Sequence, residues 1–265
     1  MDYEDLEIYP IQPPKEEKKI KHHPDYFDLN TGALTVHIAK PKSGKGVCCV
    51  NQLLNPAFDL LNKLDQVHIY SPTAKHDATW RHVVEVNGDR IYENYSDKHL
   101  RNILENQLRY PKNKRPTIAI IFDDIATFPN INKNSLLFGL ASNYRHFFNG
   151  GLLYYCVQQF KQIPPIVRAS MDFCLISRVT NRKELDDLEF EIGGKYDNQF
   201  RNLLEQATSK PYAFLYLRLN DNPSTAFQNF TKKIYTAKQT GFLEVDHGKI
   251  SDKKEDTDDE EEDKK

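Results

Sequence analysis

A turn that follows an apolar strand carries residues suited to binding a polyphosphate. Residues 34–46 read Leu-Thr-Val-His-Ile-Ala-Lys-Pro-Lys-Ser-Gly-Lys-Gly. Glycines in such a turn let backbone N–H groups point at phosphate oxygens, and a lysine can contact the outer phosphates. The start of the following helix adds free N–H donors and a positive dipole end. The expected phosphate-binding residues are Lys42, Ser43, Gly44, Lys45 and Gly46.

The turn departs at two positions from the phosphate-loop pattern G-x-x-x-x-G-K-[ST]. Ala39 replaces the first glycine, which is tolerable if its φ is negative. Gly46 stands where a hydroxyl should bind Mg²⁺, so a water would have to replace that ligand. Ser43 is displaced by three residues and cannot simply substitute. Taken alone, the turn is also compatible with an ordinary strand-to-helix connection that exposes a lysine.

Two adjacent carboxylates end a second apolar strand. Residues 117–124 read Thr-Ile-Ala-Ile-Ile-Phe-Asp-Asp. Open α/β sheets bind ligands at the carboxyl ends of their strands, where these side chains would lie. We expect Asp123 to bind Mg²⁺, through water, and Asp124 to polarise the attacking water. The implied cofactors are ATP and Mg²⁺; the alternative is a solvated strand end.

A glutamine and an arginine follow the next apolar strand, 152–157. Gln158 at the strand tip is suited to orienting the attacking water or sensing the terminal phosphate. Arg168 is ten residues further on and is suited to contacting a phosphate, in its own subunit or in a neighbour. The plainer alternatives are loop polarity for Gln158 and an ion pair for Arg168.

These residues need a sheet whose strand ends meet at one edge. Strand patterns alternate with helical patterns, which predicts an α/β fold with a mainly parallel sheet and helices on both faces. An extended pair is expected in 81–95 around the turn signal Asn87-Gly88-Asp89, and a strand or arm in 226–235. The other expected strands are 34–40, 67–71, 117–122, 152–157, 173–179 and 212–219, and the expected helices are 46–54, 98–110, 134–148, 183–192 and 198–207.

Composition limits the class of protein. The 265 residues suffice for one domain with tails, and we expect an irregular segment 1–28, a P-loop ATPase-like domain 29–245 and an acidic disordered tail 246–265. No apolar run approaches the ~18 residues needed to cross a bilayer. The four cysteines sit in apolar segments without metal-ligand spacing, so we expect reduced core residues of a cytosolic or nuclear protein.

The order of these blocks resembles the packaging ATPases of poxviruses and related large double-stranded DNA viruses, within the FtsK–HerA group of P-loop motors. The resemblance covers roughly residues 30–180, and each block is short. The matching pieces are Ile38 with Ser43-Gly44-Lys45, 67–72 with Trp80, 121–125, 143–146 before a strand, and Gln158 with Pro164, Pro165 and Arg168.

This resemblance implies a RecA-like P-loop NTPase that forms a homo-oligomeric ring and moves viral DNA into capsids. It implies that Lys45 is the phosphate lysine, Asp123 and Asp124 the metal and catalytic acids, and Gln158 the sensor. Arg168 would be an arginine finger acting across a ring interface. The implied partners are double-stranded DNA and capsid or portal components, and the implied location is the host cytoplasm (virus factory) and the virion.

Three functions fit the sequence. The first is an ATP-driven DNA translocase with a degenerate phosphate loop. The second, favoured by Ala39 and Gly46, is a non-hydrolysing P-loop-fold protein that acts in assembly or DNA binding. The third is a P-loop kinase for a small molecule, which would need an arginine-rich lid that the sequence does not offer.

Overall fold

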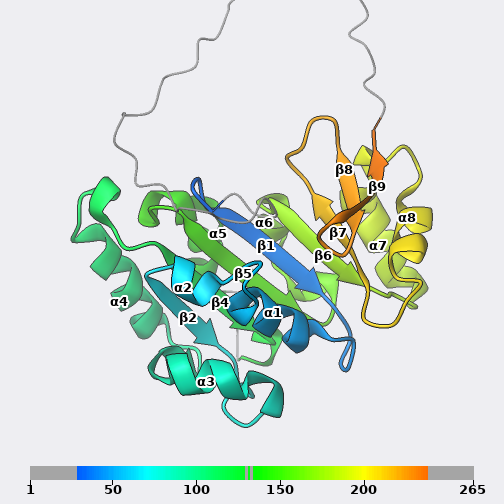
Figure 1. The fold of residues 1–265 in the computed structure, drawn as a ribbon. Coiled ribbons are helices and arrows are strands. Elements are labelled where there is room, and N and C mark those ends of the chain that lie inside the picture. Colours follow the sequence, from blue (N-terminus) through cyan, green and yellow to red (C-terminus); the bar gives the residue numbers. More distant parts are fainter. Residues whose placement is uncertain (1–28, 129–130, 132–133, 238–265) are drawn as a thin grey trace, which may run out of the picture.

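One nine-stranded sheet runs through the part of the chain that the computed structural model describes, residues 29–128, 131 and 134–237 (Figure 1). The strand order is β3-β2-β4-β5-β1-β6-β7-β8-β9. The strands are β1 Ala33–Ile38, β2 Gln66–Tyr70, β3 Ile91–Tyr92, β4 Ile118–Asp123, β5 Gly151–Val157, β6 Phe173–Ser177, β7 Phe214–Arg218, β8 Thr225–Gln228 and β9 Lys232–Thr236.

The sheet is parallel from β3 to β6 and antiparallel from β6 to β9. β1 lies between β5 and β6, and β5 separates β1 from β4. Every residue of β1, β4 and β5 is buried. Parallel strands covered on both faces read as continuous apolar runs, which is why these segments are recognisable in the sequence.

Eight α-helices connect the strands within the described residues. They are α1 Lys45–Leu54, α2 Leu60–Lys63, α3 Arg81–Asn87, α4 Asp97–Leu108, α5 Ser135–Phe147, α6 Pro165–Ala169, α7 Arg182–Ile192 and α8 Phe200–Ala207. Several begin at side-chain caps: Ser96 accepts from the backbone N–H of His99, Asn134 from Leu137 and Asn181 from Glu184.

Side chains of the sheet pack into two cores, one on each face. In β4, Ile118, Ile120 and Phe122 join one core, and Ala119 and Ile121 join the other, because successive strand side chains point to opposite faces. Helices α1, α2 and α3 cover the second core, whereas α4, α5, α6, α7 and α8 cover the first. Figure 1 shows α1 and α2 in front of the strands and α5 and α6 behind them. The expected parallel sheet with helices on both faces is confirmed.

The expectation of an extended pair in 81–95 is wrong. The segment forms helix α3 and only the two-residue strand β3, which pairs with β2. Trp80 and Val83 are fully buried at helical spacing, so packing decides the conformation. Asn87 lies at the end of the helix, and its side chain donates to the Val67 carbonyl at 2.9 Å. The Asn-Gly pair therefore ends a helix instead of turning a hairpin.

The segment 226–235 forms two antiparallel strands, β8 and β9, where the sequence indicated one strand or arm. Helix α6 was also not expected. The expected segment 1–28 and the acidic tail 246–265 lie outside the described residues. Within the described ranges, no helix is both long and apolar enough to span a membrane. The four cysteines form no disulfide, as expected for reduced residues.

Candidate functional site

The connection from β1 to α1 forms a loop at the carboxyl edge of the sheet. Its backbone turns left-handed at Lys42 (φ 64°) and at Gly44 (φ 86°). Gly44 precedes the first residue of α1 and accepts a hydrogen bond from the Cys48 N–H at 2.8 Å. Glycine is favoured here because a φ of 86° strains any residue with a Cβ, and such a Cβ would also lie only 3.1 Å from the Tyr212 ring. The loop delivers free N–H groups at the start of α1, where an anion can bind.

Ala39 fits the loop without backbone strain. Its φ is not among the positive values, and its N–H donates to the Val157 carbonyl at 3.0 Å. Replacement of the first glycine of the pattern therefore does not disturb the path of the chain.

Gly46 is the second residue of α1, and its missing side chain leaves room on the groove side. A Cβ there would meet only Nε1 of Trp80, at 3.5 Å, an ordinary contact distance. A serine would therefore fit. The absent hydroxyl is a chemical departure from the pattern, not a steric one.

Asp123 and Asp124 converge on Lys45 from the end of β4. Asp123 is 4% exposed, and its Oδ1 lies 3.5 Å from Nζ of Lys45. Asp124 adopts a left-handed conformation (φ 49°) and donates its N–H to the Cys156 carbonyl at 3.0 Å. This turn allows both adjacent carboxylates to face the same ammonium group, and Asp124 Oδ1 forms a short ion pair with Lys45.

Charge and burial oppose each other at this cluster. Burial alone would lower the pKa of Lys45, but the surrounding negative charge outweighs it, and the pKa of Lys45 is raised. Burial raises the pKa of Asp123 despite the opposing effect of Lys45. Oδ1 of Asp123 is buried and accepts no hydrogen bond in the described structure. A hard cation or its water would satisfy that oxygen.

The few carboxylates at this site suit Mg²⁺ better than a metal ion that takes all of its ligands from the protein. Among the described residues, no group of three or more His, Cys, Asp or Glu side chains could hold a metal. Mg²⁺ keeps several waters and is bound by one or two carboxylates together with substrate phosphates. Asp123, with the neighbouring Asp124, supplies that number of carboxylates.

Gln158 reaches the same cluster from the end of β5. Its Nε2 lies 3.5 Å from Oδ1 of Asp124. Because β5 is the strand between β1 and β4, its tip lies beside both the end of β1, which leads into the loop, and the end of β4, which carries the acids. The groove around the cluster has a volume of about 390 Å³ and is lined by Lys40, Pro41, Lys42, Gly44, Lys45, Gly46, Val47, Thr73, Asp77, Thr79, Trp80, Asp123, Asp124 and Gln158.

Ser43 lies on the other side of the loop, where it lines a second hollow together with Lys42. Its N–H donates to the Lys40 carbonyl at 3.2 Å. The structure thus brings Lys42, Gly44, Lys45 and Gly46 to the groove and leaves Ser43 beside it.

Arg168 does not reach the groove. Its Nε lies 3.1 Å from Oε2 of Glu191, and its guanidinium lies 5.0 Å from the centroid of the Phe160 ring. The side chain is 11% exposed. Helix α6, which the sequence pattern did not predict, turns Arg168 toward α7. Within its own chain, Arg168 therefore forms the ion pair that the sequence left open as the alternative to a phosphate contact.

Ser71 is a site residue that the sequence reasoning missed. It follows β2, is fully buried, and its Oγ donates to Oδ2 of Asp123 at 3.0 Å. It also accepts from the Ala74 N–H at 3.2 Å. The available signal was its position at a strand end, but only the pairing of β2 with β4 places it beside Asp123.

No protein-family model and no curated protein matches this sequence. Solved structures do. The DNA-packaging ATPase B204 from Sulfolobus turreted icosahedral virus shares 15% identity over 73% of this chain and 96% of its own, with a TM-score of 0.52. The genome packaging NTPase B204 from Sulfolobus turreted icosahedral virus 2, in complex with sulfate, shares 18% identity over 79% of this chain and 100% of its own, with a TM-score of 0.51. At these identities the comparison shows the fold: the chain has the α/β, RecA-like architecture of these packaging ATPases.

Proposed function

We propose that this protein is a Mg²⁺-dependent ATPase that drives packaging of double-stranded DNA. The observation that carries the proposal is the convergence of Lys45, Asp123, Asp124 and Gln158 on one groove. The ends of β4 and β5 and the start of α1 supply these groups, and their chemistry matches what phosphoryl transfer needs. The fold shared with viral packaging ATPases supports the assignment to packaging.

Two carboxylates hold Lys45, those of Asp123 and Asp124. A bound triphosphate offers this ammonium group more negative charge and takes it from Asp124. The freed Asp124 carboxylate can then accept a hydrogen bond, and the proton, from an attacking water. The Gln158 amide, next to Asp124, can orient that water.

Asp123 is the residue that would hold Mg²⁺, with a water in place of the hydroxyl that Gly46 lacks. When bound, the cation would neutralise charge on the transferred phosphoryl group. Ser71 fixes the Asp123 carboxylate by its hydrogen bond to Oδ2, so that Oδ1, which faces Lys45 at 3.5 Å and accepts no hydrogen bond, is the oxygen that would meet the cation.

Packaging implies further partners. We propose a homo-oligomeric ring around double-stranded DNA, acting with capsid or portal components in the host cytoplasm and carried into the virion. Arg168 would serve as the arginine finger of such a ring only by exchanging its partner Glu191 for a phosphate of the neighbouring subunit.

A second candidate function is a P-loop-fold protein that holds nucleotide without hydrolysing it and acts in assembly or DNA binding. Gly46 favours it, since this residue removes a direct metal ligand. Turnover of ATP separates the two candidates.

The test is ATP hydrolysis by the full chain with Mg²⁺, measured with and without double-stranded DNA. We expect Lys45→Ala and Asp124→Asn to lower turnover by about 100-fold or more, because each removes a charge from the reacting groups. Arg101→Gln, at an exposed arginine of α4 outside the groove, serves as a control variant. Wild-type turnover no higher than that of Lys45→Ala, even with DNA and capsid components, would rule out the enzyme and favour the second function.

Nucleotide binding can be followed separately from turnover. Trp80 is the single tryptophan of the chain, and it lines the groove beside Gly46. Its fluorescence should therefore change on titration with Mg²⁺-ATP. A change without hydrolysis would identify the non-hydrolysing protein.

A further inference from the structure

A second hollow lies against the phosphate loop, on the side away from the aspartates. Lys42 and Ser43 of the loop form one wall, Arg178 after β6 another, and Lys210 and Tyr212 before β7 a third. Its volume is about 390 Å³, within the range of small-molecule sites. Lys42 also lines the groove, so the two spaces adjoin at the loop.

The strand order fixes the direction in which a nucleotide would lie. β1, which leads into the loop, has β5 on one side and β6 on the other. Asp124 and Gln158 follow β4 and β5, so the terminal phosphate belongs on that side. A nucleotide with its phosphates on the loop must then extend its nucleoside toward β6 and β7, where the second hollow lies.

Tyr212 presents an aromatic ring at this hollow in a costly conformation. The residue is 72% exposed and has a φ of 62°. A bulky side chain with positive φ is uncommon, and such strain gathers at ligand sites. The ring packs against the loop, since a Cβ at Gly44 would lie 3.1 Å from it. Burial of the ring does not explain its position, because most of it faces solvent.

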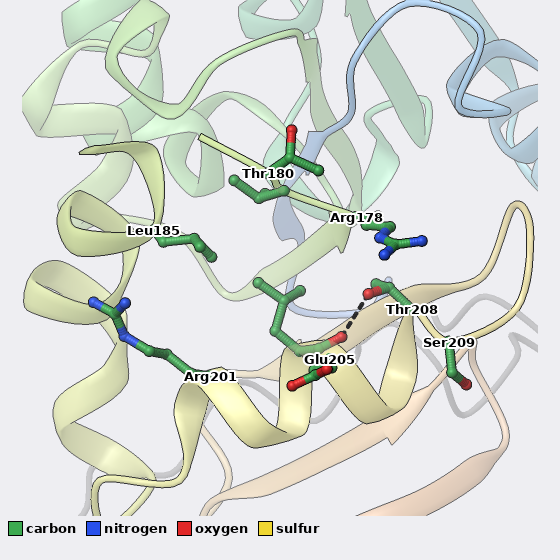
Figure 2. Close-up of a pocket in the computed structure, with 9 residues that line it drawn as sticks. Arg178, Thr180, Leu185, Arg201, Glu205, Thr208 and Ser209 are labelled. Carbon is green, nitrogen blue, oxygen red and sulfur yellow. Dashed lines mark hydrogen bonds between the residues drawn. The ribbon is translucent and has the colours of Figure 1, made fainter. Parts of the chain in front are cut away.

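Arg178 adds a positive charge at the same place. It is exposed at the carboxyl end of β6 and, within the part of the chain that the structure describes, it makes no hydrogen bond or ion pair. Figure 2 shows Arg178 near Thr208, at one end of an adjoining hollow between α7 and α8. A free guanidinium beside a phosphate loop can contact the phosphate or sugar nearest the base.

We propose that this hollow is the nucleobase subsite of the chain, with Tyr212 as the stacking face for the base and Arg178 as a contact to the adjoining ribose and phosphate. The proposal rests on the proposed nucleotide-binding function of the groove. Stacking on a tyrosine ring is tolerant of base identity, because every base has a π-face. The subsite would therefore add affinity for nucleotides over bare polyphosphates.

The experiment compares Mg²⁺-ATP with inorganic tripolyphosphate, titrated by calorimetry into the full chain. The variants are Tyr212→Ala, Tyr212→Phe, Lys45→Ala and, as a matched control on another exposed tyrosine, Tyr110→Ala. We expect Tyr212→Ala to weaken ATP binding about tenfold and to leave tripolyphosphate binding unchanged. Tyr212→Phe and Tyr110→Ala should bind both ligands as the wild type does. Lys45→Ala should lose both.

Other outcomes overturn the proposal in distinguishable ways. Equal weakening of both ligands by Tyr212→Ala would mean that the ring only supports the loop. Unchanged ATP binding in that variant, or wild-type binding of tripolyphosphate as tight as that of ATP, would remove the base subsite and leave the phosphate site standing. Wild-type protein that binds neither ligand would overturn both this subsite and the proposed function.

Discussion

Lys45 and the two aspartates form a cluster in which each charge is tolerated only because of the others. The pKa of Lys45 is raised by the negative charge around it, which outweighs the effect of burial. The pKa of Asp123 is raised by burial. Removing one partner leaves a buried, uncompensated charge, which is strongly unfavourable. The cluster therefore suits a negatively charged ligand that can replace the aspartates as the partner of Lys45.

At residue scale, Gly46→Ser should raise the affinity for Mg²⁺-ATP by about tenfold, because it restores the hydroxyl that would ligate the metal and one polar interaction is worth about 1.4 kcal/mol. A side chain fits, since a Cβ would contact only Trp80 at 3.5 Å. The affinity is measured by titrating the protein with ATP at several Mg²⁺ concentrations and following the fluorescence of Trp80. Gly46→Ala is the matched control, because it adds the same Cβ without the hydroxyl and, like serine, replaces a glycine inside a helix by a better helix former. If serine and alanine behave alike, the missing hydroxyl is not what limits metal binding.

At the scale of elements, strands β1 and β2 carry two buried histidines that stay neutral. Burial, and secondarily the charge of Lys45, lowers the pKa of His37 to about 3. Burial, with Arg90 and His99, lowers the pKa of His68 to about 4. Both pKa values lie below the ordinary value of 6.5, so between these pH values the histidines are protonated in the unfolded chain and neutral in the folded chain.

This difference predicts a loss of stability in acid. As the pH falls from about 6.5 toward about 4, each histidine should lower the free energy of unfolding by about 1.4 kcal/mol per pH unit. The His37→Gln, His68→Gln double variant should therefore show a flatter pH dependence than the wild type, measured by urea unfolding at several pH values. Parallel pH dependences for the two proteins would contradict the assignment, whatever the constant offset between them.

At the scale of the whole molecule, the sheet places its functional groups on one edge, and ring assembly would bring the edge of one subunit near the next. A contact between unlike surfaces closes into a ring when its rotation allows. If the subunits act together, one inactive member should disturb its neighbours. We therefore expect mixtures with Lys45→Ala to lose DNA-stimulated ATPase activity faster than the fraction of variant rises.

The measurement is turnover against the fraction of Lys45→Ala at constant total protein, after subunit exchange. Activity that falls more steeply than in proportion to the fraction of variant supports a coordinated ring. A straight line would mean that each subunit works independently, and sedimentation of the same mixtures would show whether a ring forms at all.

The sequence by itself determined which segments become buried strands and which residues end them. Residues 118–122 and 152–157 are apolar throughout because both faces of the central sheet are covered, and a run of that kind can be recognised without coordinates. The loop that precedes Lys45 and the acids that follow 117–122 could be recognised by spacing and residue type. The resemblance to packaging ATPases added the order of the blocks.

Only the tertiary structure decided which of these residues meet. Ser71 lies beside Asp123 because β2 pairs with β4, and Tyr212 lies against Gly44 because β7 follows β6 in the sheet. Arg168 leaves the groove because α6 turns it onto Glu191. In 81–95, the burial of Trp80 and Val83 prevailed over the local turn signal. A local pattern indicates the conformation that its own segment prefers. Which side chains share a site depends on pairing and packing between segments far apart in the sequence, and no single segment contains that information.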